Sequence, residues 1–190
     1  MKKILSPFGL KLINLTLLIL AIYGFFYFET SIIIRLLVIF LGLLSISLMA
    51  KFGELLVLVT FYLSLDVLYN IRYGLAVPMS LILIAVFGLA IFLFYTSLSL
   101  KNDLSLEKDV LLVYLLVVGL ILVEIFQVMS FWPVDPKTKV LTMTIVFYAL
   151  SKTVYLYINN VLSLKRISGI LAVSIVILGA VFSLSNWLGF

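Results

Sequence analysis

The chain has 190 residues, of which 65% are apolar and 11% are charged, and its formal net charge is +5. A soluble domain is about 45–50% apolar and about 25% charged, so this composition excludes a water-soluble globular domain. A disordered chain is excluded as well, because such chains lack apolar side chains. The composition indicates an integral membrane protein.

The sequence contains no His and no Cys. This removes the commonest general base, every thiolate nucleophile and the usual zinc ligands. The glycines are scattered singly, so there is no phosphate-binding loop. Basic residues stand singly or in pairs at the ends of apolar segments, unlike the basic patch of a nucleic-acid-binding protein. We therefore expect no enzymatic activity, no catalytic residue, no metal, no cofactor and no nucleic-acid partner.

Apolar runs long enough to cross a bilayer follow one another along the whole chain. A hydrocarbon core about 30 Å thick needs about 20 apolar residues of helix. Seven runs meet this requirement: residues 10–28, 32–50, 55–72, 75–97, 110–131, 140–159 and 167–187. The predicted fold class is an all-α polytopic transmembrane bundle of seven helices, with residues 1–190 in a single domain.

The first run follows Lys2 and Lys3, a combination that also begins signal peptides. The run is long, however, and no pattern of small residues for cleavage follows it. We therefore expect it to be a retained membrane anchor.

Three connections are predicted from charges, glycines and prolines. Residues 51–54 combine two charges with a glycine, and residues 132–137 contain two prolines and a tryptophan. Residues 55–97 would be about 65 Å long as one helix, so the chain must turn back within them. The polar residues and the glycine of the segment 70–74 make it the predicted turn.

The distribution of positive charge predicts the orientation in the membrane. With the N-terminus inside, the inner ends of the runs carry eight basic residues: Lys2, Lys3, Lys11, Lys51, Lys101, Lys108, Lys165 and Arg166. The outer ends carry four: Arg35, Arg72, Lys137 and Lys139. Because cytoplasmic ends are enriched in Lys and Arg, the N-terminus is expected inside and the C-terminus outside. Arg35 is close enough to an outer end to extend to the interface as an anchor.

Several polar side chains lie inside the apolar runs, at helical spacings of three and four residues. An ionisable group near the centre of a transmembrane helix costs about 2.5–3.5 kcal/mol on insertion scales. We therefore treat these side chains as a candidate intramembrane polar network: Tyr62, Asp66, Tyr69, Glu124, Gln127, Tyr148, Lys152 and Tyr155.

Two interpretations of this network remain open. In the first, the groups pair inside the bundle and fix which helices are neighbours; Lys152 would meet Asp66 if the third and sixth helices touch. In the second, the carboxylates line a path for a proton or a cation, and Lys152 is their internal counter-ion. The first is favoured because one acid and one base at similar depth can neutralise each other.

The last run has one face of small residues at helical spacing: Ser168, Ala172, Gly179, Ser183 and Asn186. A thin face of this kind allows close approach of another backbone. We expect it to pack inside the bundle; the alternative is contact with a partner subunit.

The segment from Glu124 to Lys165 carries an acidic residue, then the sequence Phe-Trp-Pro-Val-Asp-Pro at 131–136, then an apolar run with Tyr148. It resembles uncharacterised multi-pass membrane proteins of small-genome bacteria. The resemblance covers about a fifth of the chain and implies no activity, cofactor or site residue.

The function predicted from these observations is a non-enzymatic structural or assembly component of a membrane complex, located in the cell membrane. The alternative is a small transporter or ion-coupled carrier that uses Asp66, Glu124 and Lys152. The expected partners are the lipid bilayer and either other membrane protein subunits or further copies of this chain.

Overall fold

The computed structural model describes residues 7–47, 53–99 and 108–185, and nearly all of them are helical. Each predicted apolar run forms one helix, and no strand occurs in these ranges. The helices are α1 (Pro7–Phe28), α2 (Ile32–Ser47), α3 (Gly53–Gly74), α4 (Met79–Ser99), α5 (Lys108–Phe131), α6 (Pro136–Ile158) and α7 (Leu164–Leu184). The predicted all-α helical bundle is confirmed.

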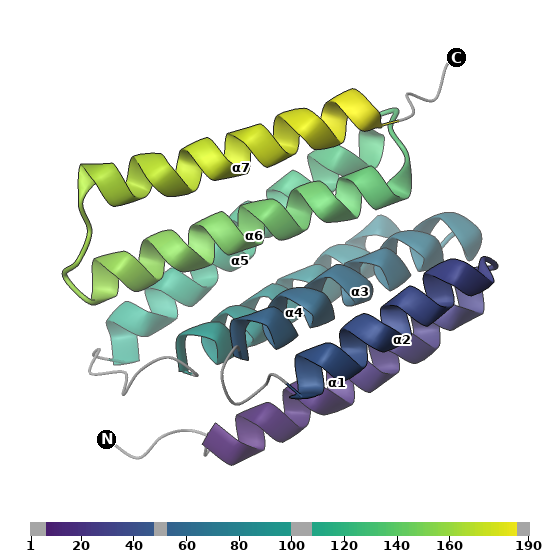
Figure 1. Cartoon of the computed structure of the whole chain (residues 1–190), viewed down its shortest axis with the longest axis horizontal. Helices are drawn as coiled ribbons and strands as arrows, with labels where there is room; N and C mark the ends of the chain where they lie inside the picture. The colour runs from purple at the N-terminus through teal and green to yellow at the C-terminus, as the bar shows by residue number, and fades with distance from the viewer. Residues whose placement is uncertain (1–6, 48–52, 100–107, 186–190) are drawn as a thin grey trace.

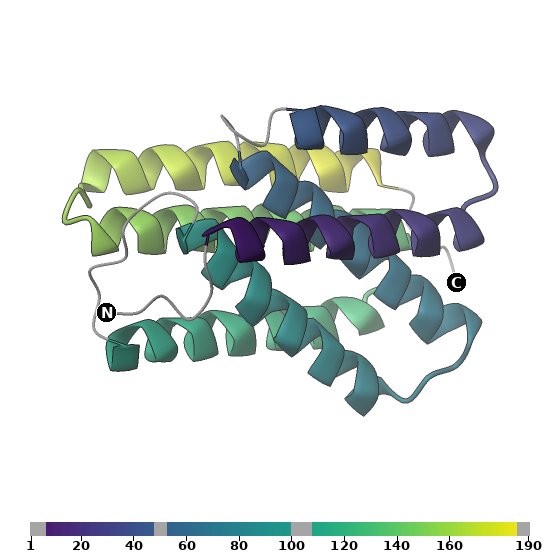
Figure 2. The ribbon, with the colours of Figure 1, turned by 90° about the horizontal axis from the view of Figure 1, so that it is seen from below.

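Successive helices run in alternating directions (Figures 1 and 2), so α1 begins at one end of the bundle and α7 finishes at the other. We call the end where α1 begins the proximal end and the opposite one the distal end. An odd number of crossings requires this arrangement. Which end faces the cytoplasm remains the prediction made from the positive charges.

Six of the described helices are long and apolar enough to cross a membrane, and α2 is the exception. Its 16 residues extend about 24 Å, less than the hydrocarbon core of about 30 Å. A short apolar helix is accommodated by local thinning of the bilayer or by flanking side chains that reach the interface. The seventh crossing therefore stays a prediction.

The helix α3 lies at the centre of the bundle, against α1, α2, α4 and α6. Aromatic side chains fill its interfaces. Phe61 stacks on Phe147 of α6 with ring centroids 4.2 Å apart, and Tyr69 stacks on Phe126 of α5 at 4.3 Å. These four rings are fully or almost fully buried. Two polar residues of α3, Thr60 and Asp66, are buried at these interfaces.

The turn between α1 and α2 is held by Arg35. Its guanidinium donates hydrogen bonds to the carbonyl oxygens of Phe26 (2.9 Å) and Glu29 (2.6 Å). Carbonyl groups in the last turn of a helix have no hydrogen-bond partner within that helix. This arginine supplies hydrogen bonds to two carbonyl groups at the end of α1. Arg35 lies at the distal end, as its interfacial role requires.

The connections at 70–74 and 51–54 differ from the prediction. The helix α3 continues through Gly74, and the turn lies at residues 75–78, where Ala76 adopts a left-handed conformation with φ 51°. Arg72 stabilises this turn through a hydrogen bond of 3.2 Å to the carbonyl oxygen of Val77. Gly53 and Glu54 are not part of a connection, because they form the first turn of α3.

The predicted connection at 132–137 is confirmed in its essentials. The helix α5 ends at Phe131, and α6 begins at Pro136, directly after Asp135. The Asp135 carboxylate accepts hydrogen bonds from the backbone N–H of Thr138 (2.9 Å) and from its hydroxyl (2.6 Å). Asp at the N-cap followed by Pro is a strong signal for the start of a helix.

The helix α7 lies at the periphery and contacts α6 alone among the described helices. Its small-residue face does not pack inside the bundle, so that expectation is wrong. Four members of this face are exposed: Ser168, Ala172, Gly179 and Ser183. A Cβ atom added at Gly179 would meet no atom within 4 Å. Asn186, the fifth member, lies outside the described residues.

Candidate functional site

Lys152 forms an ion pair with Glu54, not with Asp66. The distance from Lys152 Nζ to Glu54 Oε2 is 2.9 Å, and the pair links α6 to the first turn of α3. The ammonium group also lies 5.9 Å from the centre of the Tyr148 ring. The third and sixth helices do touch, as the predicted pairing required, but the carboxylate is a different one.

Depth explains the change of partner. Lys152 is six residues, or about 9 Å, from the proximal end of α6, whereas Asp66 is 13 residues, or about 20 Å, from the proximal end of α3. A lysine side chain extends readily toward the nearer membrane surface. Glu54 lies at that surface. The pair thus joins two helix ends on the proximal side.

Beside the pair is a small cavity of about 10 Å³, lined in part by Ser97 and Ser151. The hydroxyl of Ser151 is buried and has no hydrogen-bond partner among the described residues. A cavity of this size has space for at most about one water molecule. The proximal pair is therefore a compact polar contact, with too little space beside it for a substrate.

Asp66 is 3% exposed and lies about 12 Å from the distal end of α3. Its carboxylate accepts a hydrogen bond of 2.9 Å from the side-chain amide of Asn70, one turn along the same helix. No basic side chain in the described part of the chain forms a salt bridge with it. Asp66 is thus the most enclosed carboxylate of the predicted network.

The tyrosines of the predicted network lie in different places. Tyr69 is fully buried in the core beside Phe126, and Tyr62 borders a crevice described below. Tyr155 is half-buried near the proximal end, where its carbonyl oxygen accepts a hydrogen bond from Asn159. The structure therefore distributes the predicted network over separate locations.

Glu124 and Gln127 face away from the bundle. Both side chains are exposed on α5, and Leu120 and Val128 are exposed on the same face. Within the described residues, no hydrogen bond or ion pair involves Glu124. It lies seven residues, or about 10 Å, from the distal end of α5, too deep for its short side chain to reach the interface. In a membrane this carboxylate would face lipid or a neighbouring protein.

A third group of polar side chains lies at the distal end. Lys137 Nζ is 2.7 Å from Glu29 Oε2, which joins the start of α6 to the turn after α1. Lys139 is 4% exposed and donates to the Tyr73 hydroxyl at 3.2 Å. The Tyr73 hydroxyl donates in turn to the carbonyl oxygen of Ser130 at 2.6 Å. These contacts connect α1, α3, α5 and α6 at one end of the bundle.

The hydrogen bond from Lys137 and another from the backbone N–H of Ser31 lower the pKa of Glu29 below its ordinary value of 4.5. A carboxylate with a lowered pKa in the folded state stabilises the fold above the unfolded-state pKa and loses this effect as the pH falls through the folded-state value. We expect the melting temperature of the wild type to fall between pH 5 and pH 3 relative to that of Glu29→Gln. The difference corresponds to less than about 1 kcal/mol, because Lys137 is half-exposed. If the melting temperatures of the wild type and of Glu29→Gln change equally with pH across this range, the assignment is contradicted.

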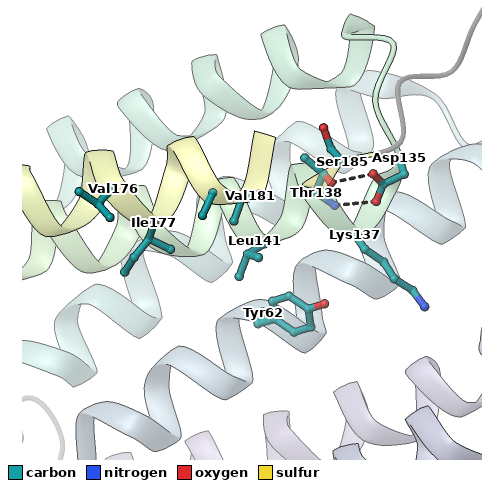
Figure 3. A pocket seen from close by; sticks show the side chains of 10 residues that line it. Tyr62, Asp135, Lys137, Thr138, Leu141, Val176, Ile177, Val181 and Ser185 are labelled. Carbon is teal, nitrogen blue, oxygen red and sulfur yellow. Dashed lines mark hydrogen bonds between the residues drawn. The ribbon is translucent and has the colours of Figure 1, made fainter. Parts of the chain in front are cut away.

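A lateral crevice of about 510 Å³ lies between α3, α6 and α7. Its lining includes Asp135, Lys137, Thr138 and Ser185 toward the distal end, and Figure 3 shows the apolar side chains of Leu141 and of α7 along its length. The crevice exists because α7 packs against α6 and leaves space beside α3.

Sequence reasoning missed two polar residues of the bundle. It assigned Glu54, three residues after Lys51, to a connection. An acidic side chain is also favourable in the first turn of a helix, where it interacts with the helix dipole. It passed over Asn14, which is fully buried in α1 and whose side-chain atoms have no hydrogen-bond partner among the described residues. An amide within an apolar run is the signal that would have marked it.

Among the described residues, no group of three or more acidic side chains is arranged to hold a metal ion. Comparison of the chain with known protein families, with curated proteins and with solved structures finds no match. The class that the fold defines is an integral membrane protein built as a helical bundle.

Proposed function

We propose that this protein is a non-enzymatic assembly component of a membrane complex and that the exposed face of α5 binds another membrane-spanning subunit. The observation that carries the proposal is the position of Glu124, an ionisable side chain on the outside of the bundle at membrane depth. Such residues almost always face the interior of a bundle or a water-filled cavity and pair with another polar group. A partner helix removes the cost of leaving the carboxylate in hydrocarbon.

Gln127 supports the same conclusion, because it lies one helical turn beyond Glu124 on the exposed face. Polar side chains that hydrogen-bond across helices are common contacts between transmembrane segments. The matching partner is a helix with a hydrogen-bond donor, such as an amide or a basic side chain, at this depth.

A different chain fits this face better than a second copy. Two copies inserted in the same orientation would pair about a two-fold axis, which brings equivalent residues together. The two Glu124 carboxylates would then approach each other and repel. The proposed partner is therefore another subunit.

The size of the complex in the membrane of origin tests the proposal. After extraction in mild detergent, the wild-type protein should migrate in a native gel within a larger complex, and Glu124→Ala should shift at least about tenfold more of it to the free form, a change of about 1.4 kcal/mol. Leu112→Ala, on the proximal half of the same helix, is the matched control and should leave the complex intact. Equal complex formation by all three proteins would overturn the proposal.

A carrier function is the second candidate, and Asp66 is the observation that favours it. This carboxylate is buried in the central helix without a basic partner among the described residues, as a proton or cation site requires. Cation- or proton-dependent uptake into vesicles with purified protein, abolished by Asp66→Asn in a folded variant, would support this function. Uptake equal to that of empty vesicles would exclude it.

A further inference from the structure

The crevice between α3, α6 and α7 changes from polar to apolar along its length. Asp135 is the N-cap of α6, Thr138 is in its first turn, and Ser185 caps the end of α7, so all three lie at the distal end. Leu141 and the stretch 176–181 of α7 form the deeper wall, which is apolar. This order, polar at the surface and apolar inside, is that of a membrane lipid.

The depth of the crevice matches one leaflet. From Ser185 to Val176 there are nine residues, or about 13 Å of helix. Half of a hydrocarbon core of about 30 Å is about 15 Å. The volume of about 510 Å³ lies within the range of about 300–1,000 Å³ that binding sites for small molecules occupy. An acyl chain that enters from the distal surface therefore reaches the bottom of the crevice.

The charges at the mouth are of both signs. The Lys137 side chain is half-exposed there and its ammonium pairs with Glu29, and Asp135 lies two residues earlier in the chain. Each carboxylate oxygen of Asp135 accepts one hydrogen bond from Thr138 and retains a further lone pair. A headgroup with a phosphate and a primary amine complements both charges. A purely anionic headgroup would be repelled by the carboxylates.

We propose that this crevice binds one phospholipid of the distal leaflet, with a headgroup of the phosphatidylethanolamine type. Its phosphate lies beside Lys137, its amine beside Asp135 and one acyl chain along Leu141 and α7. Figure 3 shows the Tyr62 hydroxyl directed toward the side of the crevice where Lys137 lies. There it can donate to an ester carbonyl group between headgroup and chain. The site is independent of the α5 face and of the proposed function.

Photolabelling tests the acyl-chain position. The full-length protein is reconstituted in nanodiscs with a phosphatidylethanolamine that carries a diazirine on its acyl chain, and labelled peptides are mapped by mass spectrometry. Label should concentrate on residues 176–181 and on Leu141. Ala180→Phe fills the crevice and should lower this label about tenfold, as a loss of about 1.4 kcal/mol of affinity does. Ala172→Phe, on an exposed part of the same helix, is the matched control and should not.

Competition tests the headgroup. Unlabelled phosphatidylethanolamine should displace the label, and phosphatidylglycerol should not. Asp135→Asn removes the carboxylate but retains an equally good N-cap, so it should abolish this preference while α6 stays folded. The lipid site is overturned if the label on α7 only equals that on exposed Leu116 and Leu120 of α5 and is unchanged in Ala180→Phe. In that case only bulk lipid contacts the crevice. Equal displacement by both lipids would overturn the headgroup assignment.

Discussion

Replacement of Lys152 by Met is expected to destabilise the protein by about 1–2 kcal/mol, because it removes the ion pair with Glu54 that joins α6 to the proximal end of α3. Replacement of Glu54 by Gln should have an effect of similar size. The double variant should lose less unfolding free energy than the sum of the losses in the two single variants. Polar contacts between transmembrane helices are worth about 0.6 kcal/mol on average and up to about 1.7 kcal/mol. The coupling energy should fall in this range.

Unfolding of the wild type, the two single variants and the double variant in detergent gives this coupling energy. The matched control is a second cycle, with Asp66→Asn in place of Glu54→Gln. Sites without a shared contact are additive within about 0.3–0.5 kcal/mol, so this second cycle should show no coupling. A larger coupling of Lys152 to Asp66 than to Glu54 would contradict the observed ion pair.

Replacement of Glu124 by Leu is expected to have opposite effects on the isolated protein and on the complex. Loss of a charge from the outer face of α5 should favour insertion of that helix by about 2–3 kcal/mol, given the cost of ionisable residues on insertion scales. The same change removes the acceptor for the partner, so the complex should be lost. A residue that only stabilises the bundle would change both properties in the same direction.

An insertion assay that compares α5 with Glu124 and with Leu at this position measures the first effect. Val128→Leu is the control, because it alters an apolar side chain on the same exposed face and should change neither insertion nor assembly appreciably. If Glu124→Leu lowers the stability of the isolated protein, the carboxylate has an internal role and the assignment of the α5 face is wrong.

The sequence was sufficient to predict the helices, because the length of an apolar run alone determines whether it can form a transmembrane helix. The start of α6 was also accessible, since Asp135 and Pro136 carry a local capping signal. The turn after α3 was not, because it uses a left-handed Ala76, two residues beyond the glycine of the predicted turn. Turn positions depend on how the next helix packs, and the sequence around Gly74 does not contain that information.

The partners of the charged residues could not be predicted from the sequence, for a different reason. Spacing along a helix determines which residues share a face, but the rotation of each helix in the bundle depends on the packing of all its neighbours. Glu124 could not be placed outside the bundle, nor could Glu54 be matched to Lys152, without that rotation. The prediction for the small-residue face of α7 was wrong for the same reason, because α6 is the one described helix that α7 contacts.

Crosslinking inside the native membrane tests the central claim most directly. A photoreactive amino acid at Leu120, which is exposed one turn before Glu124, would react with whatever covers this face of α5. The account predicts an adduct with a polypeptide of defined mass that disappears when Glu124 is changed to Leu and persists in Val128→Leu. Adducts with lipid alone, or a polypeptide adduct that is equally strong without the Glu124 carboxylate, would contradict it.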